Sequence, residues 1–312
     1  MTAKIFIDGE VGTTGLQIRQ RLSGRRDVEL ISIPEAERKD AKRRAQMLNG
    51  ADLAILCLPD DAAREAVSLV SNPETRIIDA STAHRTTAGW VYGMPEWDDG
   101  QGARIGKARR VANPGCYALA SVAMLHPLVK AGLLPADHPL AINAVSGYSG
   151  GGRRMIASFE DKSAPDYTEA PFRVYGLGLE HKHVDEIQAH GSLTRRPLFV
   201  PSVGRFAQGM IVQLPLQLDA LPSKPKGRDV HGVLAKHYRG RPLVNVAGLD
   251  ETAAMTGLEP EALNGTDGLR LYVFANDRRG HAVVMALLDN LGKGAAGQAV
   301  QNMNLMLGLD EM

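Results

Sequence analysis

Cysteine, net charge and long apolar runs are all scarce in this sequence. Two cysteines among 312 residues are too few for a disulfide framework, which suits a reducing compartment with free thiols. Lysine and arginine (36) nearly balance aspartate and glutamate (35), so no net field favours nucleic acid or an anionic membrane. No apolar stretch approaches the roughly 20 residues that span a bilayer, and residues 1–9 lack a signal-peptide core. We expect a soluble, unprocessed, cytoplasmic protein that acts on a small molecule.

The order of apolar runs and helix-like stretches predicts the fold class. The chain is long enough for two lobes, and its 44% apolar content can fill a sizeable core. Its first third reads as strands separated by single helices, which predicts a parallel, doubly wound α/β sheet with helices on both faces. The segments are 4–7, 14–22, 28–33, 40–48, 53–58, 60–70 and 76–79.

The texture changes from Leu140 onward. Longer strands with period-2 alternation, clearest at Val212, Leu214, Leu216 and Leu218, predict a mixed α+β lobe. A strand at 281–288 and a final helix with apolar residues at helical spacing follow. We therefore expect the second lobe to be inserted before this last helix.

A glycine-rich turn follows the first strand directly and opens the first helix. Its glycines are Gly9, Gly12 and Gly15, with Thr13 and Thr14 between the last two. Glycines at such a turn let the backbone approach a pyrophosphate, and the free N–H groups and helix dipole offset its charge. The spacing is G-x-x-G-x-x-G, not the usual dinucleotide pattern, so a turn that only connects strand to helix remains an alternative.

The end of the second predicted strand bears on the choice of nucleotide. An NAD site usually places an acid there to bind the ribose diol, but residues 31–34 contain none. Ser32, Arg38 and Lys39 could instead accommodate a 2′-phosphate, which favours NADP. Glu35 and Glu37 lie close enough to keep NAD open, and the two basic residues also fit a solvated helix face.

The two cysteines have different surroundings. Cys116 follows Asn113-Pro-Gly and precedes an apolar stretch, 118–128, that reads as a buried helix. A cysteine at a helix N-terminus is stabilised as the thiolate, the form that attacks carbonyls. Cys57 lies within an apolar run read as a strand, where burial raises the pKa and makes a thiol inert. We therefore expect Cys116 to be the nucleophile.

A thiolate acting beside a nicotinamide also needs an acid or base. His181 and His183 are candidates, because alternate residues of an extended segment point the same way and histidine titrates near neutrality. Taken alone, the pattern His181-x-His183-x-x-Glu186 could also be a metal site or a polar surface turn. Beside Cys116 it favours catalysis, and we expect no metal.

The motifs together resemble a known family, the N-acetyl-gamma-glutamyl-phosphate reductases of arginine biosynthesis, within the wider semialdehyde dehydrogenase group. The resemblance covers nearly the whole chain, and its glycine loop and glycine-rich turn look like the shorter subtype. The motifs are the glycine loop at 9–15, Asp79-Ala-Ser-Thr-Ala-His-Arg85, Tyr92-Gly-Met-Pro-Glu96, Asn113-Pro-Gly-Cys-Tyr117, Ser146-Gly-Tyr-Ser-Gly-Gly-Gly-Arg153, His181-Lys-His-Val-Asp-Glu186 and Asn290-Leu-Gly-Lys-Gly-Ala-Ala-Gly-Gln298.

The resemblance implies an organisation and a reaction. It implies a Rossmann-like NADP-binding domain at 1–113 and 290–312, and an inserted catalytic and oligomerisation domain with a mixed sheet at 114–289. Cys116 would attack an acyl phosphate, expel phosphate and form a thioester that NADPH reduces to the aldehyde. His181 or His183 would hold the thiolate and protonate the oxyanion, with Glu186 in the same motif. A homo-oligomer, dimer or tetramer, is implied as well.

The remaining site residues are assigned by their motifs. By the resemblance, residues 293–298 would carry the chain back over the cofactor, and Asn290 and Gly294 would bind it, although a simple turn before a helix is the alternative. Asn113 reads either as a helix cap or as an active-site amide. Arginines recognise phosphate and carboxylate in a bidentate manner, yet a surface role suits them too. The expected substrate-binding residues are Asn113, Ser149, Arg153, Arg85 and Arg205.

Three rival functions fit parts of the sequence. The chain could reduce another acyl phosphate of the aspartyl or aminoadipyl type. It could also be a catalytically silent NADP-binding regulator whose cysteine senses oxidation, although such a sensor would not need the paired histidines. A cysteine hydrolase is the third, and it would have no use for the dinucleotide loop.

Overall fold

The computed structural model describes residues 2–38 and 40–311, so the predicted contact of Lys39 lies outside the described residues. The chain forms two compact units. Unit 1 comprises the described residues up to Gly115 and those from Ala295 onward, and unit 2 runs from Cys116 to Gly294. The sequence placed the breaks a few residues earlier, after 113 and after 289. Within the described ranges, no helix is long and apolar enough to cross a membrane.

Unit 1 is built on a six-stranded sheet in which every neighbouring pair is parallel, in the order β2-β1-β3-β4-β6-β5. Parallel neighbours require crossover connections, and these are the helices that the first third of the sequence predicts. The strands are β1 (Ala3–Asp8), β2 (Val28–Ile31), β3 (Leu53–Leu56), β4 (Arg76–Asp79), β5 (Val91–Tyr92) and β6 (Arg110–Ala112).

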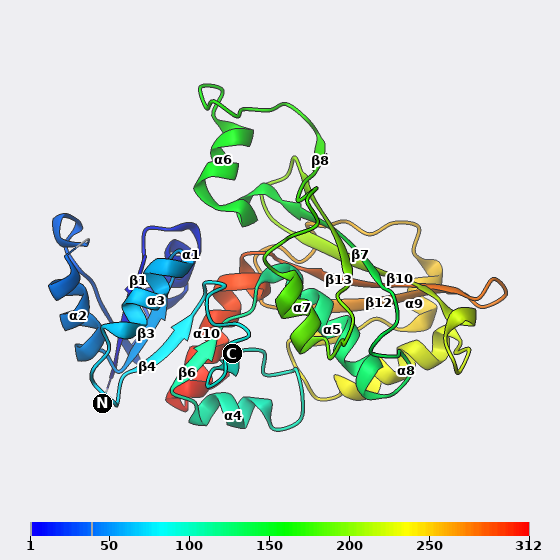
Figure 1. Ribbon diagram of the computed structural model, residues 1–312, viewed down its shortest axis with the longest axis horizontal. Helices are drawn as coiled ribbons and strands as arrows, with labels where there is room; N and C mark the ends of the chain where they lie inside the picture. Colours follow the sequence, from blue (N-terminus) through cyan, green and yellow to red (C-terminus); the bar gives the residue numbers. More distant parts are fainter. Residues whose placement is uncertain (1, 39, 312) are drawn as a thin grey trace. The chain divides into compact units, whose positions relative to one another are not determined.

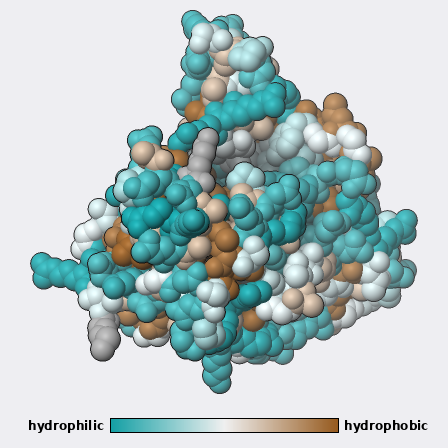
Figure 2. Space-filling model, turned by 60° about the vertical axis from the view of Figure 1, so that its left-hand side comes forward, coloured by the Kyte–Doolittle hydropathy of each residue, from teal (hydrophilic) through white to brown (hydrophobic). Residues whose placement is uncertain are grey.

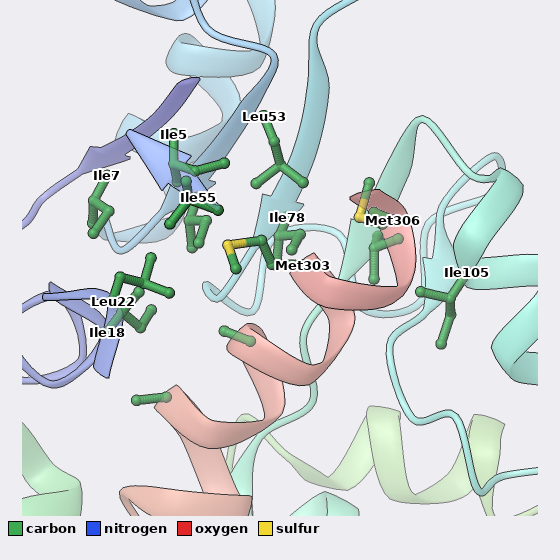
Figure 3. Packing of buried hydrophobic residues seen from close by; sticks show 14 residues of the cluster. Ile5, Ile7, Ile18, Leu22, Leu53, Ile55, Ile78, Ile105, Met303 and Met306 are labelled. Carbon is green, nitrogen blue, oxygen red and sulfur yellow. The ribbon is translucent and has the colours of Figure 1, made fainter. Parts of the chain in front are cut away.

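Helices cover both faces of this sheet because its strands are apolar on both sides. Ile5 and Ile7 of β1 belong to one buried cluster with α1, α4 and α10, whereas Phe6 between them belongs to the opposite cluster with α2 and α3. Figure 3 shows the first cluster, with Met303 close to Ile78. The helices are α1 (Thr13–Leu22), α2 (Ala41–Gly50), α3 (Asp60–Ser68), α4 (Gln101–Lys107) and α10 (Gly297–Leu307), with a 3-10 turn η1 (Glu35–Glu37).

The last helix, α10, is tied to unit 1 by polar side chains as well as by packing. Gln301 donates to the Glu96 carboxylate at 2.8 Å, and Asn302 donates to the Gly93 carbonyl at 2.8 Å. All of these residues are buried or nearly so. The Tyr92-Gly-Met-Pro-Glu96 motif therefore anchors the C-terminal helix to the sheet region.

Unit 2 is built on a seven-stranded mixed sheet in the order β11-β12-β13-β10-β7-β9-β8. Only the pairs β11–β12 and β7–β9 are parallel. The period-2 pattern at 212–218 corresponds to β10, in which Val212, Leu214 and Leu216 are buried. The strands are β7 (Ala141–Gly147), β8 (Phe172–Val174), β9 (Leu198–Gly204), β10 (Met210–Gln217), β11 (Val244–Val246), β12 (Leu269–Asn276) and β13 (His281–Leu288).

The helix α5 lies at the centre of unit 2. It contacts β13 and β10 on one side and α7 and α8 on the other, so every residue from Tyr117 to Leu128 is buried, as the apolar run predicts. In Figure 1, α6 and the segment leading to β8 extend beyond the sheet. The helical elements are α5 (Cys116–Lys130), η2 (Tyr148–Gly151), α6 (Gly152–Glu160), α7 (Val184–His190), η3 (Leu218–Ala220), α8 (Gly227–His237), α9 (Leu249–Ala254) and the π-helix η4 (Gly292–Ala296).

Two predicted strand ends are wrong by two residues. β2 ends at Ile31 and β3 at Leu56, before the predicted ends at 33 and 58. Cys57 therefore follows β3, with its N–H donating to the Asp8 carbonyl at 2.8 Å. The apolar pattern continues past each strand because the loop residues that follow are also partly enclosed. The face seen in Figure 2 is mostly hydrophilic, with hydrophobic residues scattered over it.

Candidate active site

The glycine loop connects β1 to α1 in unit 1, as predicted. Gly9 has a φ of 88°, and a Cβ there would lie 2.3 Å from the Cys57 carbonyl oxygen, so no other residue fits without a shift. The Gly12 N–H donates to the Gly9 carbonyl at 3.0 Å and closes the turn. α1 begins at Thr13 without a side-chain cap. Its first N–H groups therefore face the loop without intrahelical acceptors, as an anion site requires.

A cavity of about 390 Å³ lies beside this loop and is lined by Ser32 and Arg38, both predicted cofactor ligands. The sequence analysis missed Glu10 and Arg19, which line it too. The Glu10 carboxylate accepts from Arg38 at 3.2 Å and from Ser32 at 3.1 Å, and it also pairs with Arg19. Glu10 stands inside the glycine motif, and this position was the only local signal for it.

A second cavity, of about 370 Å³, shares Glu10 and Arg38 with the first. It contains a buried ion pair in which the Arg44 guanidinium donates to one oxygen of Asp8 at 3.0 and 3.2 Å. Burial raises the pKa of Asp8 above its ordinary value, although Arg44 opposes the rise. Both cavities are thus lined by residues of the glycine loop together with arginine side chains.

Cys116 is the first residue of α5, as predicted. Two tyrosines that the sequence analysis missed, Tyr117 and Tyr175, interact with it. Burial raises the pKa of Tyr175 to about 12, and it raises that of Tyr117 well above the ordinary value, with Cys116 adding to both shifts. Tyr175 donates to the Tyr117 hydroxyl at 3.2 Å, and Tyr117 donates to the Ser202 carbonyl at 3.1 Å. Both phenols therefore stay protonated near neutral pH.

Gly294 brings another segment of unit 2 against the cysteine. A Cβ on Gly294 would lie 2.8 Å from the Cys116 Cβ, and the Gly294 N–H donates to the Asp289 carbonyl at 2.9 Å. This close approach requires glycine. Asn290 donates to the Ser149 hydroxyl at 3.0 Å and accepts from the Gly209 N–H at 2.7 Å. Asn290 and Gly294 thus shape unit 2, and their role as cofactor ligands stays a prediction.

The two histidines belong to the same aromatic cluster, but they do not lie on an extended segment. His183 precedes α7 with φ −86° and ψ −8°, so the predicted extended geometry is wrong. A turn still brings the rings together, with centroids 4.8 Å apart, and His181 lies edge-on to both Tyr117 and Tyr175.

One hydrogen bond distinguishes His181 from His183. The backbone N–H of His183 donates to His181 Nδ1 at 3.1 Å, so Nδ1 acts as an acceptor. The ring proton of neutral His181 is therefore on Nε2. His181 is half-buried and His183 is buried, as is Glu186 in the first turn of α7. Across residues 2–38 and 40–311, no group of three or more His, Cys, Asp or Glu side chains is placed to hold a metal ion.

Two of the predicted substrate-binding arginines donate hydrogen bonds to backbone carbonyls. Arg85 is buried and donates to the carbonyls of Asn113 and Ala80 at 3.0 and 3.1 Å. Arg205 donates to the Phe159 carbonyl at 3.1 Å and to that of Thr168. Both therefore hold loops in place, a use that the sequence analysis did not foresee, and their contact with substrate stays a prediction.

The other predicted substrate ligands have varied surroundings. Arg153 is exposed in the first turn of α6, whereas Ser149 is buried. Asn113 is buried in unit 1, where its amide accepts from Asn302 at 3.0 Å and donates to the Ala295 carbonyl at 3.1 Å. Asn113 therefore joins the segment after β6 to η4 and to the middle of α10.

Comparison with known proteins agrees with this geometry. The model of the semialdehyde dehydrogenase dimerisation domain matches residues 116–290, and that of the semialdehyde dehydrogenase NAD-binding domain matches residues 4–104. The N-acetyl-gamma-glutamyl-phosphate reductases of Brucella ovis and Brucella suis are each 58% identical over 309 residues, which cover 99% of this chain and all of theirs. The chain belongs to this reductase family. It is an oxidoreductase of the semialdehyde dehydrogenase group, as its motifs predict.

Solved structures of semialdehyde dehydrogenases share the fold of this family member. Aspartate semialdehyde dehydrogenase II from Vibrio cholerae has a TM-score of 0.71 at 15% identity, and the match covers 99% of each chain. The aspartate semialdehyde dehydrogenase with NADP from Candida albicans has a TM-score of 0.65 at 14% identity over the full length of both chains. The predicted α/β fold, a doubly wound sheet plus a lobe with a mixed sheet, is confirmed.

Proposed function

We propose that the chain catalyses the NADPH-dependent reduction of N-acetyl-gamma-glutamyl phosphate to N-acetyl-glutamate 5-semialdehyde, with release of phosphate, in arginine biosynthesis. The observation that carries the proposal is Cys116, at the first residue of a buried helix and beside a cluster of tyrosine and histidine side chains. The 58% identity to relatives named for this substrate supports it over aspartyl or aminoadipyl phosphate.

Cys116 performs the covalent step. Its thiolate attacks the acyl carbon, the bond to the phosphate oxygen breaks, and phosphate leaves with the electron pair, so a thioester remains on Sγ. The N–H groups of the first turn of α5 lack intrahelical acceptors and stabilise the thiolate. NADPH, when bound, supplies the hydride that reduces the thioester. Collapse of the resulting hemithioacetal releases the aldehyde and regenerates the thiolate.

His181 is the better candidate for the acid that protonates the hemithioacetal oxygen. Its Nδ1 is occupied by the His183 N–H, so Nε2 carries the transferable proton. His183 is buried and orients His181 through this backbone bond, and Glu186 lies one helical turn further along the same motif. The tyrosine pair stays protonated because burial raises both pKa values, and its two hydroxyl protons are donated to Tyr117 and to the Ser202 carbonyl.

The residues of unit 1 fit NADP. The glycine loop leads into the start of α1, which has no side-chain cap, so its first N–H groups are donors for a pyrophosphate. Gly12, Thr13, Thr14 and Gly15 would surround it at the start of α1. Ser32, Arg38 and the newly found Arg19 line the neighbouring cavity and would hold a 2′-phosphate. Glu35 is exposed on the rim of the cavity, and Glu37 pairs with Arg43. Neither acid is therefore placed as the ribose-binding acid of an NAD site would be.

Arg153 and Ser149 of unit 2 would hold the substrate. Arg153, exposed after the glycine-rich turn, offers a guanidinium for the substrate carboxylate or the departing phosphate. Ser149 is fixed by Asn290 and offers its hydroxyl. Arg85, Arg205 and Asn113 act at least by holding loops, as their backbone contacts require.

We propose different roles for the two units. Unit 1 binds the nucleotide, and unit 2 carries catalysis and the contacts of a homo-oligomer, a dimer or a tetramer. The match of residues 116–290 to a dimerisation domain supports the last point. We place the enzyme in the cytoplasm, where reducing conditions keep Cys116 as a thiol.

The reverse reaction tests the proposal. Purified protein, NADP, phosphate and N-acetylglutamate semialdehyde should generate absorbance at the nicotinamide band, and a Cys116→Ser variant should not. Turnover with aspartate semialdehyde but not with the acetylated aldehyde would reassign the protein to the rival reductases. Nucleotide binding without turnover of any aldehyde would favour the redox regulator.

A further inference from the structure

The side chain of Glu10 occupies the centre of the cationic cluster in the cavity beside the glycine loop. The side chain is only 11% exposed, and its carboxylate accepts from three donors: Arg38 at 3.2 Å, Ser32 at 3.1 Å, and Arg19. Arg19 also donates to the Ser32 hydroxyl at 3.1 Å. Three elements meet here, because Glu10 comes from the loop, Arg19 from α1, and Ser32 and Arg38 from the segment after β2.

These donors are of the kind that a ribose 2′-phosphate needs. A phosphate monoester and a carboxylate both accept charge-assisted hydrogen bonds from guanidinium groups and hydroxyls. Two anions cannot share one set of donors without repulsion, particularly where solvent is partly excluded. A ribose 2′-hydroxyl, by contrast, is neutral and can donate to a carboxylate, as the acid of an NAD site does.

We propose that Glu10 is the residue that sets the preference of this enzyme between NADPH and NADH, by competing with the 2′-phosphate for Arg19, Arg38 and Ser32. The inference rests on the proposed function, since it assumes that the glycine loop holds a nicotinamide dinucleotide. Glu10 lowers the affinity for NADPH relative to a neutral residue and leaves the enzyme able to accept NADH. Arg19 and Arg38 act in the opposite direction.

The chain offers a matched control for the charge of Glu10. Glu35 lines the same cavity, 3.9 Å from Arg38, but its side chain is 90% exposed and has no other ion pair with the described residues. Glu10→Gln and Glu35→Gln remove the same charge from the same cavity. Only Glu10→Gln removes the carboxylate to which Arg19, Arg38 and Ser32 all donate. An effect of net charge alone would therefore appear in both variants.

The experiment measures the binding of 2′,5′-ADP and 5′-AMP, two probes that differ by the 2′-phosphate, to the whole protein by calorimetry. For Glu10→Gln we expect the dissociation constant of 2′,5′-ADP to fall about tenfold, and that of 5′-AMP to change less than about twofold. Glu35→Gln should change both by less than about twofold. In the catalysed reaction, Glu10→Gln should lower KM for NADPH with kcat unchanged.

Several outcomes would overturn the role of Glu10. These are an unchanged affinity for 2′,5′-ADP, an equal gain for both probes, an equal effect of Glu35→Gln, or the same gain when Arg19→Ala is already present. A wild-type enzyme that turns over NADH faster than NADPH would instead overturn the proposed cofactor. The selective gain of Glu10→Gln for 2′,5′-ADP would even then support Glu10 as the group that opposes the phosphate.

Discussion

The two cysteines differ in their readiness to ionise. Burial, with the carboxylates of Asp79 and Asp8 nearby, raises the pKa of the Cys57 thiol to about 12. Cys116, by contrast, is the first residue of α5, and we expect the N–H groups of that first turn to stabilise its thiolate. The sequence predicted this contrast because an apolar run and a helix start are both local patterns.

Alkylation should therefore be selective. At pH 8 only about one Cys57 in ten thousand is ionised, so iodoacetamide should modify Cys116 and abolish activity while Cys57 stays intact. Peptide mass spectrometry at increasing times measures both sites. A Cys57→Ala variant should keep full activity and the same sensitivity. Modification of Cys57 at a comparable rate would contradict its enclosure.

Gly294 is expected to control the placement of the nucleophile. In Gly294→Ala the new methyl group would meet the Cys116 Cβ at 2.8 Å, and displacement of the thiolate should lower kcat about tenfold to hundredfold. Gly257→Ala is the control in the same unit, because nothing lies within 4 Å of its Cβ position. Steady-state kinetics and thermal melts of both variants measure the effect. Equal activity of the two variants would show that the segment yields without cost.

At the scale of elements, α2 is joined to β1 by the buried pair Arg44 and Asp8, whose side chains are 9% and 8% exposed. Removing one partner of such a pair leaves a buried charge, so Arg44→Met should lower the free energy of unfolding by about 3–5 kcal/mol. Arg43→Ala breaks the exposed pair with Glu37 and should cost about 0–1 kcal/mol. Urea unfolding at pH 8 compares the two variants.

The Asp8 pair also has a pH signature. Burial raises the pKa of folded Asp8 above 3.8, so the folded state holds the proton more tightly, and stability falls as pH rises above that value. Arg44 opposes this rise, and its removal should deepen the loss at high pH. We therefore expect the deficit of Arg44→Met to shrink as the pH of the unfolding experiment falls from 8 toward 5. A deficit independent of pH would assign the cost to packing.

Element order was predictable because each helix and strand of unit 1 has its own period of apolar residues and its own boundary signals. The strands predicted at 28–33 and 53–58 are each two residues too long. Their apolar pattern reports burial, whereas a strand ends where its hydrogen bonds to the neighbouring strands end. The turn at His181 and His183 was read as extended because a two-residue spacing says nothing about the backbone between. Hydrogen bonding decided both cases.

At the scale of the whole molecule, unit 2 exposes apolar side chains on and after its edge strand β8. Phe172 and Val174 are 54% and 40% exposed, and Leu177 and Leu179, which follow, are 78% and 54% exposed. Exposed apolar side chains at a sheet edge favour a contact with another chain. We therefore expect this edge to contribute to the proposed homo-oligomer.

Charged substitution tests this edge. Leu177→Lys combined with Phe172→Lys should lower the mass in solution toward the monomer, because each lysine would have to be desolvated in the contact. Leu16→Lys in unit 1, where the side chain is similarly exposed at 51%, should leave the mass unchanged. Light scattering coupled to size exclusion gives the masses. An unaltered mass for the double variant would place the contact elsewhere on unit 2.

The sequence by itself determined the alternation of strands and helices, the glycine turn between β1 and α1, and the position of Cys116 at the start of a buried helix. Each depends on residues that are neighbours along the chain, so propensity and periodicity are enough to specify it. The reductase motifs are also local patterns of residue types, so they identified the family from the sequence alone.

Only the tertiary structure decided which side chains meet. It brought Glu10 to Arg38 across 28 positions, set Tyr175 on Tyr117 across 58, and engaged Arg85 and Arg205 with backbone carbonyls. These contacts join elements that are distant in sequence, and their geometry depends on how sheets twist and helices pack. No local pattern encodes that packing, so the contacts of Glu10 with Arg19, Arg38 and Ser32 and the aromatic surroundings of Cys116 appeared only in the folded chain.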